Sequence, residues 1–246
     1  MTSRRVEHHM GTVVSITTRG AVDPGVVDQA FAEVRRIERS FSTFLEDSHI
    51  SRIQRGELPI ERAPIEVREV LAACDGLVEG TGGRFQHRPG GWGLDPSAYV
   101  KGWAGDIVGK ILAAGGCREY SINMGGDVLS SGGTEQQPWA IGIQHPSEPD
   151  SIAAVLPIGT AAVATSGSYE RGDHIRGADG SLRSVTVIGP ELAIADALST
   201  AMFSGGIGDL RWMTGYPGYE ALFITRDRVH WSEGLEGLLA GAIQVG

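Results

Sequence analysis

Two oxygen-bearing side chains lie four residues apart in the segment Leu192 to Phe203, whose pattern is that of a helix. Asp196 and Thr200 therefore project from one helix face, which we expect solvent to reach. Carboxylate and hydroxyl oxygens are hard donors that suit Mg²⁺, with phosphate oxygens and water completing the shell. The ordinary alternative is a solvated Asp196 and a Thr200 hydroxyl that bonds a helix carbonyl. Spacing alone favours this alternative, because such pairs are common on helices.

A second candidate is the loop that starts at Gly93 and leads into a helix near Ser97. The free N–H groups and the positive dipole end of a helix start attract phosphate and other anions. Asp95 is placed to accept hydrogen bonds from a ring or ribose, and Lys101 to face the anion. The alternative is an ordinary loop in which Ser97 caps the helix.

The segment Asn123-Met124-Gly125-Gly126-Asp127 ends a predicted strand with two glycines. It resembles a nucleotide-binding loop but lacks the spacing of a dinucleotide or P-loop fingerprint. A tight turn between two strands explains it equally well.

A histidine follows another predicted strand. His174 is suited to general-base chemistry, because the unperturbed pKa of histidine, ~6.5, lies near working pH. The alternative is an exposed loop histidine without a chemical role.

The surrounding pattern predicts an α+β fold. Apolar spacing and capping signals predict four helices, over 24–40, 64–80, 97–112 and 192–203. Alternating β-branched residues predict strands over 13–18, 120–124, 139–144, 153–158, 161–166, 184–188, 220–225 and 229–231. Helices come first and strands later without regular alternation, which favours a mixed or antiparallel sheet flanked by helices. We expect a single domain over residues 1–246.

Composition excludes some functions. The 246 residues carry a formal net charge of −9, so the basic field of a nucleic-acid binder is missing. An acidic protein still binds an anionic nucleotide if a divalent cation screens the phosphates. Cys74 lies in an apolar helical pattern and is expected to be a buried thiol. The chain has no apolar leader and no membrane span of ~20 residues, so we expect a soluble cytoplasmic protein.

Motifs from residue 10 to about 205 resemble, in order, those of the ApbE family, the FAD:protein FMN transferases. The matching segments are Met10–Thr12, Phe41–Phe44, Asp47–Ile53, Leu94–Asp106, Asn123–Asp127, Pro138–Ile143, Ala164–Gly167 and Ala195–Ala201. The resemblance implies magnesium-dependent transfer of FMN from FAD to a threonine or serine of an acceptor flavoprotein, such as a redox-complex subunit, with release of AMP.

The resemblance also implies roles for individual residues. Asp196, Thr200 and the backbone carbonyl of Ala98 would hold magnesium, with manganese as the other candidate metal. His174 would assist the acceptor hydroxyl, and we count it with Asp196 and Thr200 as catalytic. The implied FAD contacts are Met10, Phe44, Phe85, Asp95, Lys101 and Ile175, with Phe44 flanking the flavin.

Two segments depart from the family pattern. Phe85 is followed by Gln86 where the family has F-D-x-T, and only eight residues separate Phe85 from Leu94. After His174-Ile175 the chain lacks the proline and threonine of the family's D-P-x-T-G. Two alternatives therefore stay open: a metal-dependent FAD pyrophosphatase, in which water replaces the acceptor, and a flavin-binding protein without catalysis.

Overall fold

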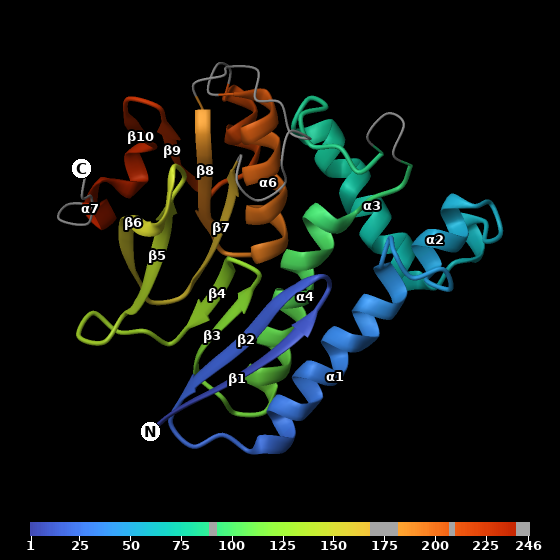
Figure 1. Ribbon diagram of the computed structural model, residues 1–246, viewed down its shortest axis with the longest axis horizontal. Coiled ribbons are helices and arrows are strands. Elements are labelled where there is room, and N and C mark those ends of the chain that lie inside the picture. Colours follow the sequence, from blue (N-terminus) through green and yellow to red (C-terminus); the bar gives the residue numbers. More distant parts are fainter. Residues whose placement is uncertain (89–92, 168–181, 207–209, 240–246) are drawn as a thin grey trace.

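The computed structural model describes residues 1–88, 93–167, 182–206 and 210–239 (Figure 1). Its main sheet has eight strands in the order β1-β2-β3-β4-β7-β8-β9-β10, and every neighbouring pair is antiparallel. The strands are β1 (Thr2–His9), β2 (Thr12–Arg19), β3 (Glu119–Met124), β4 (Asp127–Ser131), β7 (Ala161–Gly167), β8 (Leu182–Gly189), β9 (Glu220–Thr225) and β10 (Val229–Trp231). The α+β prediction is confirmed.

The α-helices of the described residues and a separate two-stranded hairpin lie outside this sheet (Figure 1). They are α1 (Pro24–Phe41), α2 (His49–Gln54), α3 (Ile65–Gly80), α4 (Ser97–Ala114), α6 (Leu192–Gly205), α7 (Glu236–Leu239) and the hairpin of β5 (Trp139–His145) and β6 (Glu148–Ile158). Helices α1, α4 and α6 lie along one face, and the β5–β6 hairpin lies on the other.

Alternation along the central strands explains this layering. In β8, Val185 and Val187 belong to the core under the helices, whereas Ile188 packs in a separate core with residues of β6 such as Leu156. Successive side chains of a strand point to opposite faces, so an apolar strand such as β8 builds both cores.

Helix α1 forms where the sequence predicts it. The Asp23 carboxylate accepts the N–H of Gly25, and Pro24 occupies the first helical position. Most of its apolar residues, among them Phe31 and Phe41, are buried, and the helix ends at Phe41.

Apart from α7 and the short 3-10 helices, three elements are absent from the sequence prediction. Strand β1 lies at the edge of the sheet and is rich in charged residues, so it lacks the pattern of a half-buried strand. In β4 four of the five residues are buried, which hides the period of two. Helix α2 has only six residues, and Ser48 caps it.

Cys74 is fully buried and outside any disulfide, as predicted. Among the described residues, no helix is both long and apolar enough to cross a membrane.

Candidate active site

The side chains of Asp196 and Thr200 are buried, with exposed fractions of 2% and 8%. The hydroxyl oxygens of Ser166, on β7, and Thr200 lie 3.2 Å apart. Ser166 also lies 2.9 Å from the hydroxyl of Ser199, which donates to the Asp196 carbonyl. The expectations of a solvated Asp196 and of a face open to solvent are therefore wrong. The two residues share a helix face, as predicted, but β7 and α4 cover it.

Lys101 brings a positive charge to the same place. Its Nζ lies 2.5 Å from Oδ2 of Asp127, at the start of β4, and 3.9 Å from Oδ2 of Asp196. The other oxygen of Asp127 accepts the N–H of Thr165 at 3.0 Å. Both carboxylates are only 2% exposed. One lysine thus lies between two buried carboxylates from different elements, and sequence reasoning did not assign this role to Asp127.

The segment before Asp127 is a tight turn. Gly125 and Gly126 join β3 to β4 with φ of 70° and 108°, values that glycine adopts without strain. The Asn123 side chain accepts the N–H of Gly126 at 2.9 Å. The turn interpretation is therefore confirmed.

The start of α4 differs from the prediction. Its N-cap residue is Pro96 rather than Ser97, and the helix has no side-chain cap, although the Asp95 carboxylate accepts the Ser97 N–H at 3.0 Å. The N–H group of Tyr99 bonds the carbonyl of Pro96. These donors are engaged within the protein, so this helix start offers an anion fewer N–H groups than expected. Ala98, whose carbonyl is a predicted metal ligand, lies in this first turn.

Asp106 joins α4 to the start of α6. Its two oxygens accept the N–H groups of Leu192 and Ala193 at 2.8 and 2.9 Å. Glu191, the N-cap residue of α6, gives no side-chain cap, so Asp106 supplies it from the neighbouring helix. Gly102 permits the close approach, because a Cβ there would overlap the Leu192 backbone. This contact fixes α4 against α6.

We expect the contribution of Asp106 to stability to fall as the pH rises. Burial raises its pKa from 3.8 to about 6, although the N–H groups of Ala193 and Leu192 lower it. A raised pKa means that the folded state binds the proton more tightly than the unfolded state. The carboxyl therefore favours folding most below pH 3.8, and this advantage is lost as the pH passes about 6.

Urea unfolding of the wild type and Asp106→Asn between pH 4 and 7 measures this effect, because asparagine does not titrate. The free energy of unfolding of the wild type should fall relative to that of the variant by up to roughly 3 kcal/mol. A difference that is constant or rises with pH would contradict the assignment.

The predicted FAD-contacting aromatic residues lie in different surroundings. Phe44 follows α1 and is 92% exposed, so its ring is open to a ligand from solvent. Phe85 is fully buried, with its ring 6.5 Å from that of His87. Phe44 is therefore placed to meet a ligand, whereas Phe85 is not in this conformation. His174 and Ile175 lie outside the described residues.

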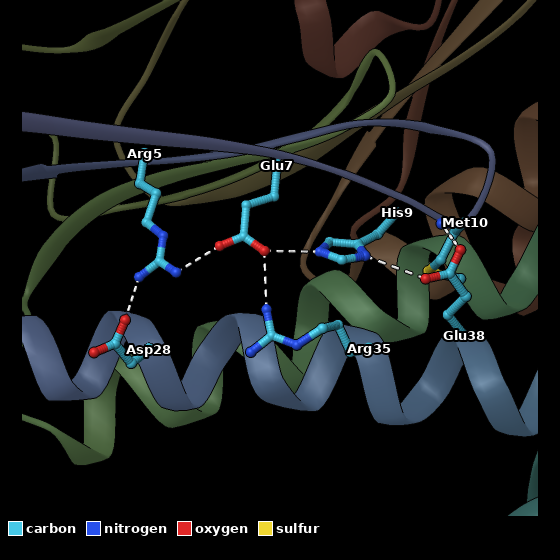
Figure 2. A network of polar contacts seen from close by, with 7 residues as sticks. All are labelled: Arg5, Glu7, His9, Met10, Asp28, Arg35 and Glu38. Atoms are coloured by element: carbon cyan, nitrogen blue, oxygen red, sulfur yellow. Dashed lines mark hydrogen bonds and ion pairs between the residues drawn. The ribbon is translucent and has the colours of Figure 1, made fainter.

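Met10 lies in the turn between β1 and β2 and has a φ of 54°. Such a conformation costs a residue with a side chain about 1–3 kcal/mol. Figure 2 shows the polar network between β1 and α1 that reaches this turn at one end, where Glu38 of α1 accepts the Met10 N–H at 2.6 Å.

The sequence profile of the ApbE family matches residues 10–88 and 85–223. The chain belongs to the ApbE family. The FAD:protein FMN transferase of Vibrio cholerae is 31% identical over 129 residues, which is 46% of this chain and 39% of that protein. The Escherichia coli protein of the same name is 29% identical over 150 residues, 54% and 43% of the two chains. The matched part thus spans less than half the length of these relatives.

Solved structures of the ApbE family have the same fold. The flavin transferase ApbE from Vibrio cholerae superposes with a TM-score of 0.82 at 20% identity, over 97% of this chain and 99% of that one. The ApbE protein from Thermotoga maritima gives 0.82 at 22% identity, with the same coverage.

The fold brings together the segments in which the ApbE resemblance lies. Lys101 comes from α4, Asp127 from β4, Ser166 from β7, and Asp196 and Thr200 from α6. We call these five residues the Lys101–Asp196 cluster. Ser166 and Asp127 were part of matching motifs, but only the fold shows that they contact the predicted site.

Proposed function

We propose that this protein is an FAD:protein FMN transferase, which moves FMN from FAD to a threonine or serine of an acceptor flavoprotein. The observation that carries the proposal is the Lys101–Asp196 cluster, in which separate ApbE motifs meet as one largely buried polar group. Buried ionisable side chains are costly to keep and concentrate at functional sites. The names of the relatives support the same activity.

The donors present fit a magnesium ion. Asp196 and Thr200 offer a carboxylate and a hydroxyl on one face of α6, and the first turn of α4 offers the Ala98 carbonyl. Such hard oxygens suit Mg²⁺, and Mn²⁺ is the other candidate. Among the described residues no three His, Cys, Asp or Glu side chains gather, so phosphate oxygens and water would complete the shell. When bound, the metal would neutralise the pyrophosphate and the departing AMP.

The chain's own groups would bind and orient the reactants. The exposed ring of Phe44 would stack on the flavin, with further contacts from the turn at Met10 and from Asp95, Lys101 and Ile175. His174 would take the proton of the acceptor hydroxyl while the oxygen of that hydroxyl bonds to the FMN phosphorus. The bond between that phosphorus and the bridging oxygen breaks, and AMP leaves with that oxygen.

Intact mass spectrometry after incubation with FAD, magnesium and a candidate acceptor tests the proposal. The acceptor should gain the mass of FMN less one water, and excess chelator should prevent the gain. FMN and AMP formed without a modified acceptor would indicate a pyrophosphatase. FAD that binds but stays intact, with several acceptors, would indicate a flavin-binding protein without catalysis. The cytoplasmic location stays a prediction.

A further inference from the structure

The β1–β2 turn has a conformation that its sequence does not favour. His9 pairs with Thr12, so Met10 and Gly11 are the two central residues, with φ of 54° and 70°. Two-residue turns of this kind favour asparagine, aspartate or glycine at the first position and glycine at the second. Gly11 satisfies this preference and Met10 does not. Some contact outside the turn must hold Met10 in this conformation.

Two contacts of this kind are present: the Met10 side chain packs against the main core, and Glu38 of α1 bonds its backbone N–H. One of its carboxylate oxygens accepts the Met10 N–H at 2.6 Å, and the other lies 3.2 Å from Nδ1 of His9 (Figure 2). Hydrogen bonds to a charged group are stronger than those between neutral groups. A single carboxylate therefore holds two consecutive residues at the end of β1.

The rest of the network holds β1 against α1 farther from the turn. Glu7 lies 2.9 Å from Arg35, and Arg5 pairs with Asp28 at the exposed end (Figure 2). Arg5, Glu7 and His9 alternate along β1, so all three side chains face the helix. The network orients the whole strand, and Glu38 is the member of it that bonds the Met10 N–H.

The last turn of α1 also leads into the segment that carries Phe44. Ser42 follows the helix directly, and its hydroxyl accepts the N–H groups of Phe44 and Leu45 at 3.1 and 3.2 Å. Glu38 lies one turn earlier, and its carbonyl accepts the Ser42 N–H. The end of α1 thus supports both Met10 and Phe44, two of the proposed flavin contacts.

We propose that Glu38 is a positioning residue for flavin binding, which acts by holding Met10 in its left-handed conformation. This inference rests on the proposed function, because it takes Met10 as an FAD contact. In this role Glu38 acts through the backbone of Met10 and does not need to touch FAD.

FAD titration by fluorescence, with magnesium present, tests this role. Glu38→Ala should weaken FAD binding by roughly tenfold, the effect of losing a charge-assisted hydrogen bond. Glu38→Gln should keep most of the affinity, because its amide oxygen still accepts the Met10 N–H. Asp28→Asn is the matched control, since it removes a carboxylate from the exposed end of the same network and should leave FAD affinity unchanged.

Hydrogen exchange and a double mutant separate positioning from a general loss of stability. The Met10 amide should exchange faster in Glu38→Ala than in the wild type, without FAD present. Glycine accepts a positive φ, so Glu38→Ala should cost less affinity in a Met10→Gly background. If Glu38→Ala alone does not fold, the double mutant of Glu38→Ala and Met10→Gly should fold, because glycine accepts the turn conformation without Glu38.

Three results would overturn the inference while leaving the proposed function intact. One is a Glu38→Ala variant that binds FAD as tightly as the wild type. Another is a loss of FAD affinity on Glu38→Ala that is equally large in the wild-type and Met10→Gly backgrounds. The third is failure of both Glu38→Ala and the double mutant to fold, which would assign Glu38 to stability alone. Absence of FAD binding by the wild type would instead refute the proposed function.

Discussion

Asp196→Ala is expected to lower the rate of metal-dependent FAD turnover by at least about 100-fold. Loss of a residue that only contacts a metal ligand typically costs ~10–100-fold, and loss of a ligand itself should cost more. Asp196 is the only carboxylate among the proposed metal ligands, and alanine leaves a hydroxyl and a carbonyl that bind a hard cation poorly. Steady-state rates over a range of magnesium concentrations measure the effect. Part of the loss should return at high magnesium if the variant only weakens metal binding.

The fold should survive this substitution, because Lys101 keeps its closer partner, Asp127, at 2.5 Å. Thermal unfolding of Asp196→Ala without metal checks this. Glu191→Gln is the matched control, because it removes an exposed carboxylate at the start of the same helix, and it should turn over FAD at the wild-type rate. A sharply lower Tm with unchanged turnover would make Asp196 a structural residue.

Much of the fold could be predicted because its signals are local. Asp23 and Pro24 mark the start of α1, and the apolar spacing that follows fixes its buried face. Strand β1 could not be predicted, because its charged side chains are stabilised by partners on α1 such as Asp28 and Arg35. A polar strand of this kind looks like a loop until its partners are known.

The candidate site could also be predicted only where its signals are local. Helical spacing correctly places Asp196 and Thr200 on one face, but whether that face meets solvent depends on β7, which contributes Ser166. The cap that Asp106 gives to α6 joins residues 86 positions apart. Such contacts follow from the packing of α4, β7 and α6, which no local pattern encodes.

Lys101→Met is expected to lower the free energy of unfolding by about 3 kcal/mol in the absence of metal, near the lower end of the range for breaking a buried ion pair. Asp127 and Asp196 would lose the ammonium group that lies between them, while methionine fills a similar volume. The lower end applies because the Lys101 side chain is 18% exposed, so water screens part of the loss. Urea unfolding in the presence of a chelator measures the change.

Magnesium should restore part of this lost stability, because a cation bound at Asp196 supplies positive charge close to both carboxylates. Lys101→Arg should retain more stability than Lys101→Met, since it keeps the charge. Lys110→Met is the matched control, because Lys110 is an exposed lysine of the same helix and its loss should change the free energy of unfolding by less than about 0.5 kcal/mol.

If Lys101→Met is as stable as the wild type, the ion pair is not a stabilising contact. If magnesium stabilises Lys101→Met no more than it stabilises Asp196→Ala, the metal does not bind beside Lys101, and the site assigned to it on α6 is wrong.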